Sequence, residues 1–352
     1  MLSSRISGLI VCDIAGLKMR RTILLFGLAA ALAACSPPAA RVTEADPAPA
    51  VPVAATPAAP PKMPDEWLPP KEKGLPMWVV RDDDSTIYLT GTVHALPPGT
   101  PWKSAKLETA LKEADEVWLE IAMTDRADLQ RRSGEVMKKY ATATKPLSSL
   151  LNETERASLA EFAHAMNMTP DQEKRLDTLK PWAVTNAINA SSMTSTGFDA
   201  EGGIDWEIAR IATGLGHKVN GFETIDFQAS VLSAGSEADQ LSQLRTMLAM
   251  PRATRERMFA MISPSFVAWA NGDTRPMTAF FTFTSLVSNL DAKQKAQLDR
   301  LLVNRNRNWA DQLEQRLKGS GVSFVAVGGG HLIGPNNLRA LLEARGIDVE
   351  RF

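Results

Sequence analysis

The sequence contains very little cysteine, very little tyrosine and no strong excess of charge of either sign. Its two cysteines, Cys12 and Cys35, both lie near the amino terminus, so the rest of the 352-residue chain can form no disulfide and no thiolate metal site. The formal net charge of -1 offers no electrostatic reason to bind nucleic acid. A hydrophobic content of 44% with 22% charged residues excludes a wholly disordered chain and is typical of one large or two small globular domains.

The segment 19–35 has the composition of a bacterial signal peptide. Two arginines precede an apolar run that is too short for a stable membrane span, and small residues lead to Cys35. The Leu-Ala-Ala-Cys ending resembles a lipobox, in which the cysteine is acylated and becomes the first residue of the mature protein. Asp13 and an earlier apolar run fit badly before such a segment, so we expect translation to begin at Met19.

This amino terminus predicts a lipoprotein of the cell envelope. We expect a signal peptide over residues 1–35 and a lipid on Cys35 that anchors the protein to a membrane. Because Ser36 follows the cysteine, we expect the outer membrane, with the protein facing the periplasm; an ordinary secretory signal is the alternative. Residues 36–70 are rich in Pro and Ala and predict a tether. The globular body then comprises residues 71–352.

The body alternates strand-like and helical segments. Strands are predicted at residues 77–80, 86–90, 116–121, 218–223 and 322–327, with a last edge strand at 347–352, and the first two form a hairpin. Helices are predicted at residues 104–114, 204–215 and 336–345. Two longer stretches, 125–196 and 226–317, have only helical periodicity, and breaks are expected in the second near Pro251, Pro264 and Pro276. The pattern predicts an α/β fold, a central mixed β-sheet flanked by helices, with two large helical insertions.

Four polar residues stand at or just after the carboxyl ends of predicted strands: His94, Glu120, Glu223 and His331. Ligands of open α/β sheets bind at this edge. The two histidines end similar motifs, 91–94 and 328–331, which begin with glycine and so permit a sharp turn and close approach of a ligand. Two imidazoles and one or two carboxylates, without sulfur, suit Zn, Mn or Co. The pattern predicts a divalent metal whose bound water attacks an amide carbonyl.

Each of these residues also has a structural interpretation. Either histidine alone is typical of a capping or core residue, Glu120 could end an edge strand in solvent, and Glu223 could face the start of the next helix. His164 and His217 lack a strand-end setting, so we leave them outside the site. Asp205, near a predicted helix start, is most simply a carboxylate that caps the helix or interacts favourably with its dipole.

Arg305 interrupts an apolar stripe on the helix that is predicted to begin near Asp291. A guanidinium on such a face needs a partner. One interpretation is a clamp for a carboxylate ligand or for a developing oxyanion. The other is a stem that packs on the core while its head reaches water. Asn306 and Trp309 could likewise be residues that only pack against the core.

The motifs of this chain, and their order along it, resemble those of the TraB/GumN family over about residues 75–352. The resemblance rests on Gly91-Thr92-Val93-His94, Leu119-Glu120, Gly203-Ile204-Asp205, Phe222-Glu223-Thr224 with Gln228, Arg305-Asn306 with Trp309, and Val325-Ala326-Val327-Gly328-Gly329-Gly330-His331-Leu332 with Gly334-Pro335. It implies a relation to the Tiki metalloproteases and to the ChaN-like and erythromycin-esterase-like folds. It also implies that His94 and His331 are paired metal ligands with Glu120 as acidic partner, and that Arg305 and Asn306 match the family's Arg-Asn pair. Glu223 matches a recurrent glutamate to which the resemblance gives no role.

These observations together predict a lipid-anchored, metal-dependent hydrolase of peptide or other amide bonds. His94, His331 and Glu120 would hold the ion, and Glu120 or Glu223 would act as general base. Arg305 with Asn306 would stabilise the oxyanion. One alternative is a non-catalytic envelope lipoprotein whose histidines hold haem or a similar ligand, which the presence of only two tyrosines disfavours. A purely structural envelope protein is a third possibility.

Overall fold

The structure is a computed structural model, and it describes residues 67, 69–70, 72–286 and 290–352. The predicted signal peptide, Cys35 and most of the predicted tether lie outside the described residues. Within the described ranges, no helix combines the length and the hydropathy needed to span a bilayer.

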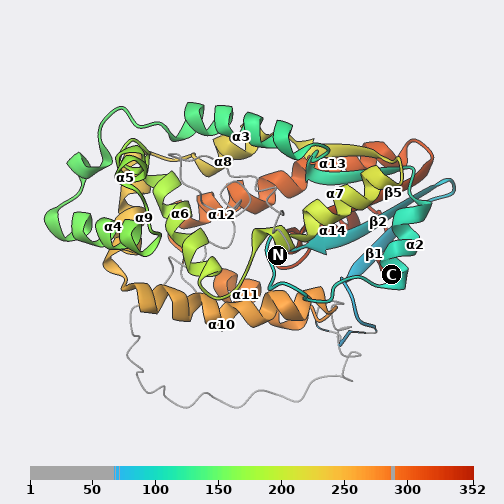
Figure 1. Cartoon of the computed structure of the whole chain (residues 1–352). Coiled ribbons are helices and arrows are strands. Elements are labelled where there is room, and N and C mark those ends of the chain that lie inside the picture. The colour runs from blue at the N-terminus through green and yellow to red at the C-terminus, as the bar shows by residue number, and fades with distance from the viewer. Residues whose placement is uncertain (1–66, 68, 71, 287–289) are drawn as a thin grey trace, which may run out of the picture.

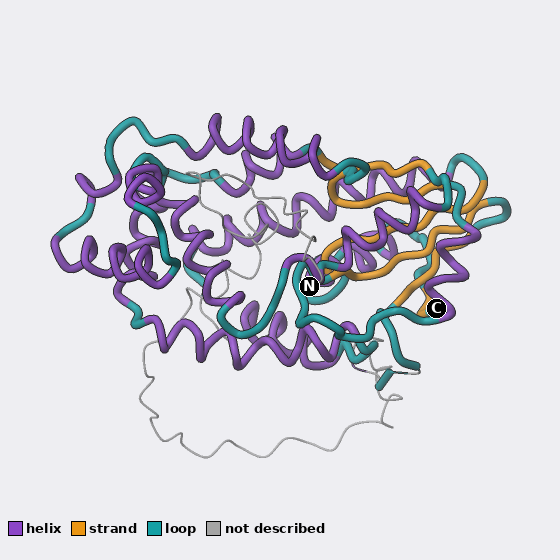
Figure 2. The backbone as a smooth tube through the Cα atoms, viewed as in Figure 1, coloured by secondary structure: helices purple, strands orange, loops and turns teal. Residues whose placement is uncertain are grey.

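A six-stranded mixed sheet forms the centre of the fold, as the alternating pattern predicts (Figures 1 and 2). Its strands are β1 (Met77–Arg81), β2 (Ser85–Thr92), β3 (Glu116–Ile121), β4 (Lys218–Glu223), β5 (Gly321–Gly328) and β6 (Glu350–Arg351). Their spatial order is β4-β3-β5-β2-β1-β6. Strand β1 is antiparallel to β2 and β6, whereas β2, β5, β3 and β4 run parallel to one another. The carboxyl ends of four parallel strands therefore meet at one edge.

The positions of β1, β2 and β5 follow from local sequence. Asp82 Oδ1 accepts hydrogen bonds from the backbone N–H groups of Asp84 and Ser85, at 3.2 and 2.7 Å, and closes the predicted hairpin turn. In β5, Phe324 to Val327 have no exposed surface. A continuous apolar run of this kind is typical of a central parallel strand that is covered on both faces.

Four helices accompany the sheet: α2 (Ala105–Glu113), α7 (Ile204–Gly214), α13 (Asn304–Leu317) and α14 (Leu338–Glu343). Helix α7 buries Ile204 and Ile208 and contacts β3, β4 and β5. It ends before Gly216, which adopts a φ of +79°. The predicted helix over residues 204–215 is one residue too long: α7 ends at Gly214, and Leu215 is 44% exposed.

Both helical insertions are present. The first contains α3 (Arg126–Ala141), η2 (Leu147–Leu150), α4 (Glu153–Ala165), α5 (Pro170–Leu176) and α6 (Pro181–Thr194), and the short turn η3 (Ala200–Gly202) follows it. The second contains α8 (Ile225–Leu232), α9 (Glu237–Ala249), α10 (Arg252–Ala270), α11 (Arg275–Leu286) and α12 (Ala292–Leu298). Helices α4, α5, α6 and α9 lie at the end of the molecule away from the sheet (Figure 1). There they help enclose a second hydrophobic core that includes Phe162, Trp182 and Leu244, separate from the core around the sheet.

The helix break expected near Pro264 is wrong, because this proline lies inside α10. A proline in a helix leaves the carbonyl four residues earlier without its usual N–H donor. In α10 this carbonyl belongs to Ala260, and the Ser263 hydroxyl donates to it at 3.2 Å. Pro251 and Pro276 stand at the starts of helices, where proline is tolerated.

The last long helix is interrupted by a π-helical turn, η4 (Asp299–Val303), which joins α12 to α13. Here the N–H of Asn304 bonds to the carbonyl of Asp299, five residues back. A π-turn adds a residue to the turn and so rotates everything that follows. The predicted apolar stripe nevertheless persists across this turn, because Leu302, Trp309 and Leu313 are buried in the core around the sheet, Leu298 packs against it, and Arg305 is buried on the same side.

Candidate functional site

The carboxyl edge of the sheet brings His94, Glu120 and His331 to one point. The backbone of Gly328 marks that point. A side-chain carbon added there would lie 3.0 Å from Glu120 Oε1, 3.6 Å from His94 Nε2 and 3.7 Å from His331 Cδ2. Glycine at position 328 therefore makes room for the side chains of the site itself. Two imidazoles far apart in the sequence thus meet beside a carboxylate.

His94 is held by Asp205, the second residue of α7. Asp205 Oδ2 lies 2.7 Å from His94 Nδ1, while Asp205 Oδ1 accepts a 2.5 Å hydrogen bond from the Thr92 hydroxyl. Burial lowers the pKa of His94, but the carboxylate of Asp205 outweighs this effect and raises the pKa to about 9. Asp205 lies in the first turn of α7, where a carboxylate interacts favourably with the helix dipole, but the capping interpretation is wrong, because its oxygens face β2 and the turn after it.

Two glycines explain how α7 comes so close to His94. A side-chain carbon added to Gly203 would lie 2.6 Å from the carbonyl oxygen of His94, and one added to Gly202 would lie 2.8 Å from that of Leu96. The N–H of Ile204 then donates to the carbonyl of Val93 at 3.0 Å. Only glycine permits this approach of the two backbones, and it places Asp205 within reach of the imidazole.

His331 has a neutral partner, Asn306 on α13. Their Nδ1 and Oδ1 atoms lie 2.6 Å apart. The amide nitrogen of Asn306 donates to the carbonyl of Asn336, so the amide oxygen faces the ring and His331 Nδ1 carries the proton. The Trp309 ring lies against the imidazole, with centroids 4.3 Å apart. Burial and the nearby Arg305 charge lower the pKa of His331 to about 3, so this ring is neutral at pH 7.

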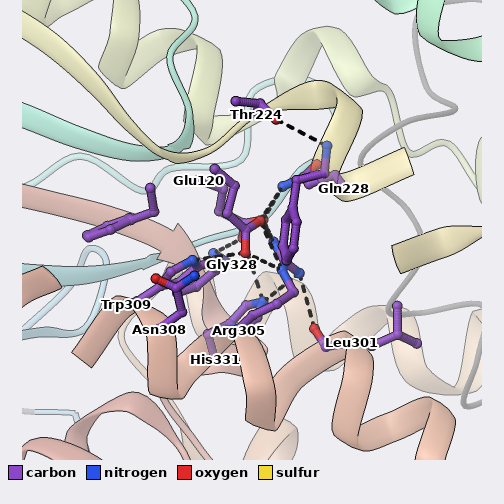
Figure 3. A network of polar contacts seen from close by, with 12 residues as sticks. Glu120, Thr224, Gln228, Leu301, Arg305, Asn308, Trp309, Gly328 and His331 are labelled. Atoms are coloured by element: carbon purple, nitrogen blue, oxygen red, sulfur yellow. Dashed lines mark hydrogen bonds and ion pairs between the residues drawn. The ribbon is translucent and has the colours of Figure 1, made fainter. Parts of the chain in front are cut away.

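Arg305 is the centre of the polar network (Figure 3). Its Nη2 donates to Glu120 Oε2 at 2.7 Å and to Glu223 Oε2 at 2.8 Å, and its Nε donates to Glu223 Oε1 at 2.9 Å. Its Nη1 lies 3.1 Å from the carbonyl of Leu301, in the π-turn, and 3.2 Å from His331 Nε2. The residue is only 8% exposed. The alternative that its head reaches water is therefore wrong.

Glu120 lies on an internal strand, since β3 is placed between β4 and β5, and it is buried. The interpretation of Glu120 as the solvent end of an edge strand is therefore wrong. The N–H of Gly328 donates to its Oε1 at 2.8 Å. Burial alone would raise the pKa of Glu120, but Arg305 and the two histidines hold the pKa well below its usual range. Glu120 is therefore ionised at neutral pH.

Glu223, at the end of β4, is enclosed by donors. Besides Arg305, the Trp309 indole donates to its Oε1 at 3.0 Å and Gln228 donates to its Oε2 at 3.3 Å. Burial raises the pKa of Glu223, although Arg305 opposes this effect. Glu223 does face the start of α8, since Gln228 of that helix donates to it, while the Thr224 side chain supplies the cap.

Sequence reasoning gave no site role to Gln228 or Asp205. Gln228, on the first turns of α8, donates to Glu120 at 3.1 Å as well as to Glu223, and thereby links the two carboxylates. A usable signal was its position five residues after Glu223, which returns a helical side chain to the strand end. His164 is exposed on α4, and His217 Nε2 lies 2.8 Å from the carbonyl of Leu111. Both stay outside the site, as expected.

Within the part of the chain that the structure describes, no three His, Cys, Asp or Glu side chains are arranged as ligands of one metal ion. Arg305 lies among the residues that sequence reasoning assigned to the ion. Its guanidinium contacts both Glu120 Oε2 and His331 Nε2, two of the atoms that sequence reasoning assigned to an ion.

The comparison with known proteins agrees with the motif order. The model of the TraB/PrgY/gumN family matches residues 76–351. The chain belongs to this family. An uncharacterized protein of Treponema pallidum (strain Nichols) is 21% identical over 278 residues, which cover 76% of this chain and 80% of the relative. No solved structure matches the chain. The predicted relation to the Tiki and ChaN proteins stays a prediction.

Proposed function

We propose that this TraB/PrgY/gumN protein is a metal-dependent hydrolase of peptide or other amide bonds, in which His94, His331 and Glu120 hold a divalent ion. One observation carries the proposal: two imidazoles, each oriented through Nδ1 by an acceptor side chain, meet at a buried carboxylate. Metal-binding histidines are typically oriented in this way by an acceptor at the second ring nitrogen. The class of substrate rests on the family resemblance alone.

The charge of the buried cluster supports a divalent ion. The cluster contains three carboxylates and one guanidinium: Arg305 pairs with Glu120 and Glu223, and Asp205 contacts His94. This leaves a formal excess of two negative charges when both imidazoles are neutral. Buried charge without compensation is costly. In the metal-free protein the raised pKa of His94 partly offsets this excess, because a proton on the ring adds a positive charge. An imidazole must lose that proton to bind an ion.

Arg305 sets the condition for ion binding. An ion on His331 Nε2 takes the place where Arg305 Nη1 lies, so the guanidinium must give up that contact. Glu223 can retain it, because Glu223 accepts from both Nε and Nη2 of Arg305. His94, His331 and Glu120 would hold a divalent ion of the Zn, Mn or Co type, provided that Arg305 gives up its contact with His331.

The side chains divide the chemistry among themselves. A bound ion supplies Lewis acidity, which lowers the pKa of water and polarises a carbonyl. Glu120 faces the histidines through Oε1, 3.9 Å from His331 Nε2, whereas Glu223 has the raised pKa that suits a general base, so both carboxylates stay candidates for the proton acceptor. Arg305 would supply positive charge for a developing oxyanion. Asn306 acts as a positioning residue for His331, because its amide already bonds to His331 and Asn336.

The test measures hydrolysis of a peptide library by metal-stripped protein before and after addition of Mn²⁺, Co²⁺ or Zn²⁺. We expect cleavage that depends on the ion and is lost in His331→Ala. His217→Ala is the matched control, since His217 binds a backbone carbonyl outside the site. Equal turnover in wild type and His331→Ala would refute the proposal. The haem alternative has no support from the tyrosines, because Tyr88 donates to Glu113 and Tyr140 donates to Asp226.

We also propose, from the sequence alone, that Cys35 carries the lipid that anchors the protein in the cell envelope. Cys35→Ser should move the protein from the membrane fraction to the soluble fraction. Cys12→Ser is the control and should change nothing, because we expect translation to begin at Met19. A soluble wild-type protein would contradict the anchor.

A further inference from the structure

Trp269 contacts both histidine-bearing turns, although it belongs to the helical insertion. It lies near the end of α10 and has no exposed surface. Its indole Nε1 donates to the carbonyl of Gly91 at 2.8 Å. A side-chain carbon added to Gly91 would lie 2.2 Å from the indole Cζ2, and one added to Gly329 would lie 2.8 Å from Cε2. Any residue larger than glycine at either position would therefore overlap the indole.

These two glycines belong to neighbouring strand ends. In the sheet, Thr92 of β2 pairs with Gly328 of β5, so each glycine lies one residue from that pair. His94 follows Gly91 by three residues, and His331 follows Gly329 by two. The first glycine of the first motif thus makes room for an indole rather than for a ligand. One rigid ring packs against the start of both turns.

We propose that Trp269 is a positioning residue of the site, whose indole sets the separation of His94 and His331. The indole N–H holds the β2 end through Gly91, while the flat face of the ring limits how closely the β5 turn can approach. Only one consequence of this proposal, the effect of Trp269 on ion binding, rests on the proposed function. The geometry of the two histidines can be tested without any ion.

Trp269→Phe is the sharpest substitution. It removes the indole N–H and the second ring, whose atoms touch the two glycines, while it keeps an aromatic side chain in the core. Trp182→Phe is the matched control. Trp182 is also buried, in the second core, and its Nε1 donates to the carbonyl of Tyr140 at 3.3 Å. Both substitutions thus remove one indole bond to a backbone carbonyl, but only one lies between the histidine turns.

The readout is the set of histidine ring signals in a long-range ¹H–¹⁵N spectrum of the metal-free protein. The chain has four histidines, so His164 and His217 serve as internal references. We expect the His94 and His331 signals to move in Trp269→Phe and to stay in place in Trp182→Phe. Unchanged His94 and His331 signals in Trp269→Phe, or equal movement in both variants, would overturn the proposal.

A Co²⁺ titration separates this proposal from the proposed function. If the wild type binds Co²⁺, Trp269→Phe should weaken binding by roughly 10–100-fold, the usual effect of losing a residue that orients ligands, and Trp182→Phe should not. Wild-type affinity in Trp269→Phe would overturn the positioning role. If the wild type binds no Co²⁺, the proposed function fails, and the histidine spectrum still decides the role of Trp269.

A compensating pair covers the case in which Trp269→Phe does not fold. The three atoms nearest to a side-chain carbon on Gly329 all belong to the Trp269 indole. Gly329→Ala should therefore lower the melting temperature, and Gly329→Ala with Trp269→Leu should restore part of it. Histidine signals that stay displaced in the double variant support the positioning role. A double variant no more stable than Gly329→Ala would show that the indole does not limit this turn.

Discussion

The two histidines end similar motifs at neighbouring strand ends, yet their electrostatic surroundings are opposite. His94 is 18% exposed at its side chain and has a carboxylate, Asp205, at Nδ1. His331 is 2% exposed and has an amide, Asn306, at Nδ1 and a guanidinium near Nε2. The pKa of the first is raised to about 9, and that of the second is lowered to about 3.

This difference shows that the motif brings an imidazole to the site but does not decide its charge. The charge depends on the residue that faces each ring from another element, α7 for His94 and α13 for His331. At pH 7 one ring carries a proton and the other does not. The pair therefore starts from one cationic and one neutral imidazole in the metal-free protein.

The largest expected effect comes from Arg305→Met. It leaves Glu120 and Glu223 buried without their shared cation, and breaking a buried pair in this way costs about 3–5 kcal/mol of unfolding free energy. Because the guanidinium helps to lower the pKa of His331, that pKa should rise from about 3, while burial keeps it below its ordinary value. Urea unfolding and an NMR titration of the ring measure the two effects.

Arg131→Met is the control for Arg305→Met. Arg131 also pairs with two carboxylates, Asp128 and Glu135, but its side chain is 61% exposed. We expect no measurable change in the unfolding midpoint, since exposed pairs contribute little. An equal loss of unfolding free energy in both variants would mean that the buried ion pairs stabilise the protein no more than the exposed ones.

Asp205→Asn should give His94 an amide at Nδ1, as His331 has, and so bring the two pKa values closer together. The substitution keeps the shape of the acceptor and removes the charge that raises the pKa of His94, so this pKa should fall well below 9. A folded pKa above the unfolded value of 6.5 stabilises the protein fully below pH 6.5, and that stability is lost as the pH rises through 9. The wild type should thus exceed the variant by roughly 3 kcal/mol near pH 6.

The stability difference should shrink as the pH approaches 9 and beyond. Urea unfolding at a series of pH values measures it. Asp226→Asn, which alters a surface contact with Lys139 and Tyr140, is the control and should leave the pKa of His94 unchanged. A stability difference that grows with pH would contradict the assignment of the raised pKa to Asp205.

Asn306→Asp is the reverse of Asp205→Asn: it replaces the amide at His331 by a carboxylate. A carboxylate at His331 Nδ1 should raise the pKa of this ring, but burial and Arg305 should keep it below that of His94. The new buried charge should cost about 1–3 kcal/mol of unfolding free energy at pH 7. An NMR titration of His331 measures the shift. A pKa that stays near 3 would show that Asn306 has little influence on this ring.

The sequence predicted the parts of the site that follow from strand periodicity. His94, Glu120, Glu223 and His331 stand at strand ends, and the parallel strands bring their ends to one edge. Such placement needs no knowledge of side-chain direction. The α/β class and both helical insertions were predictable on the same basis, since they follow from period and length alone.

The partners of these residues could not be predicted, because each depends on how a helix docks. Asp205 looked like a capping residue, since the approach of α7 to His94 is visible only from the tertiary contact at Gly203. Periodicity placed Arg305 on an apolar face, but it could not show that this residue meets Glu120 and Glu223, which come from two other elements. The role of Trp269 required knowing where the end of α10 packs.

The smallest expected effect comes from Gln228→Leu. This substitution tests whether a residue that contacts only the carboxylates affects the pKa values of the two histidines. Gln228 donates to Glu120 at 3.1 Å and to Glu223 at 3.3 Å, but both oxygens keep shorter bonds to Arg305. We expect a loss of about 1 kcal/mol of unfolding free energy and a further rise in the pKa of Glu223, because the amide helps to lower it. Both histidine pKa values should stay unchanged in an NMR titration. A large shift at His331 would mean that the amide, and not Arg305 alone, controls this ring through Glu120.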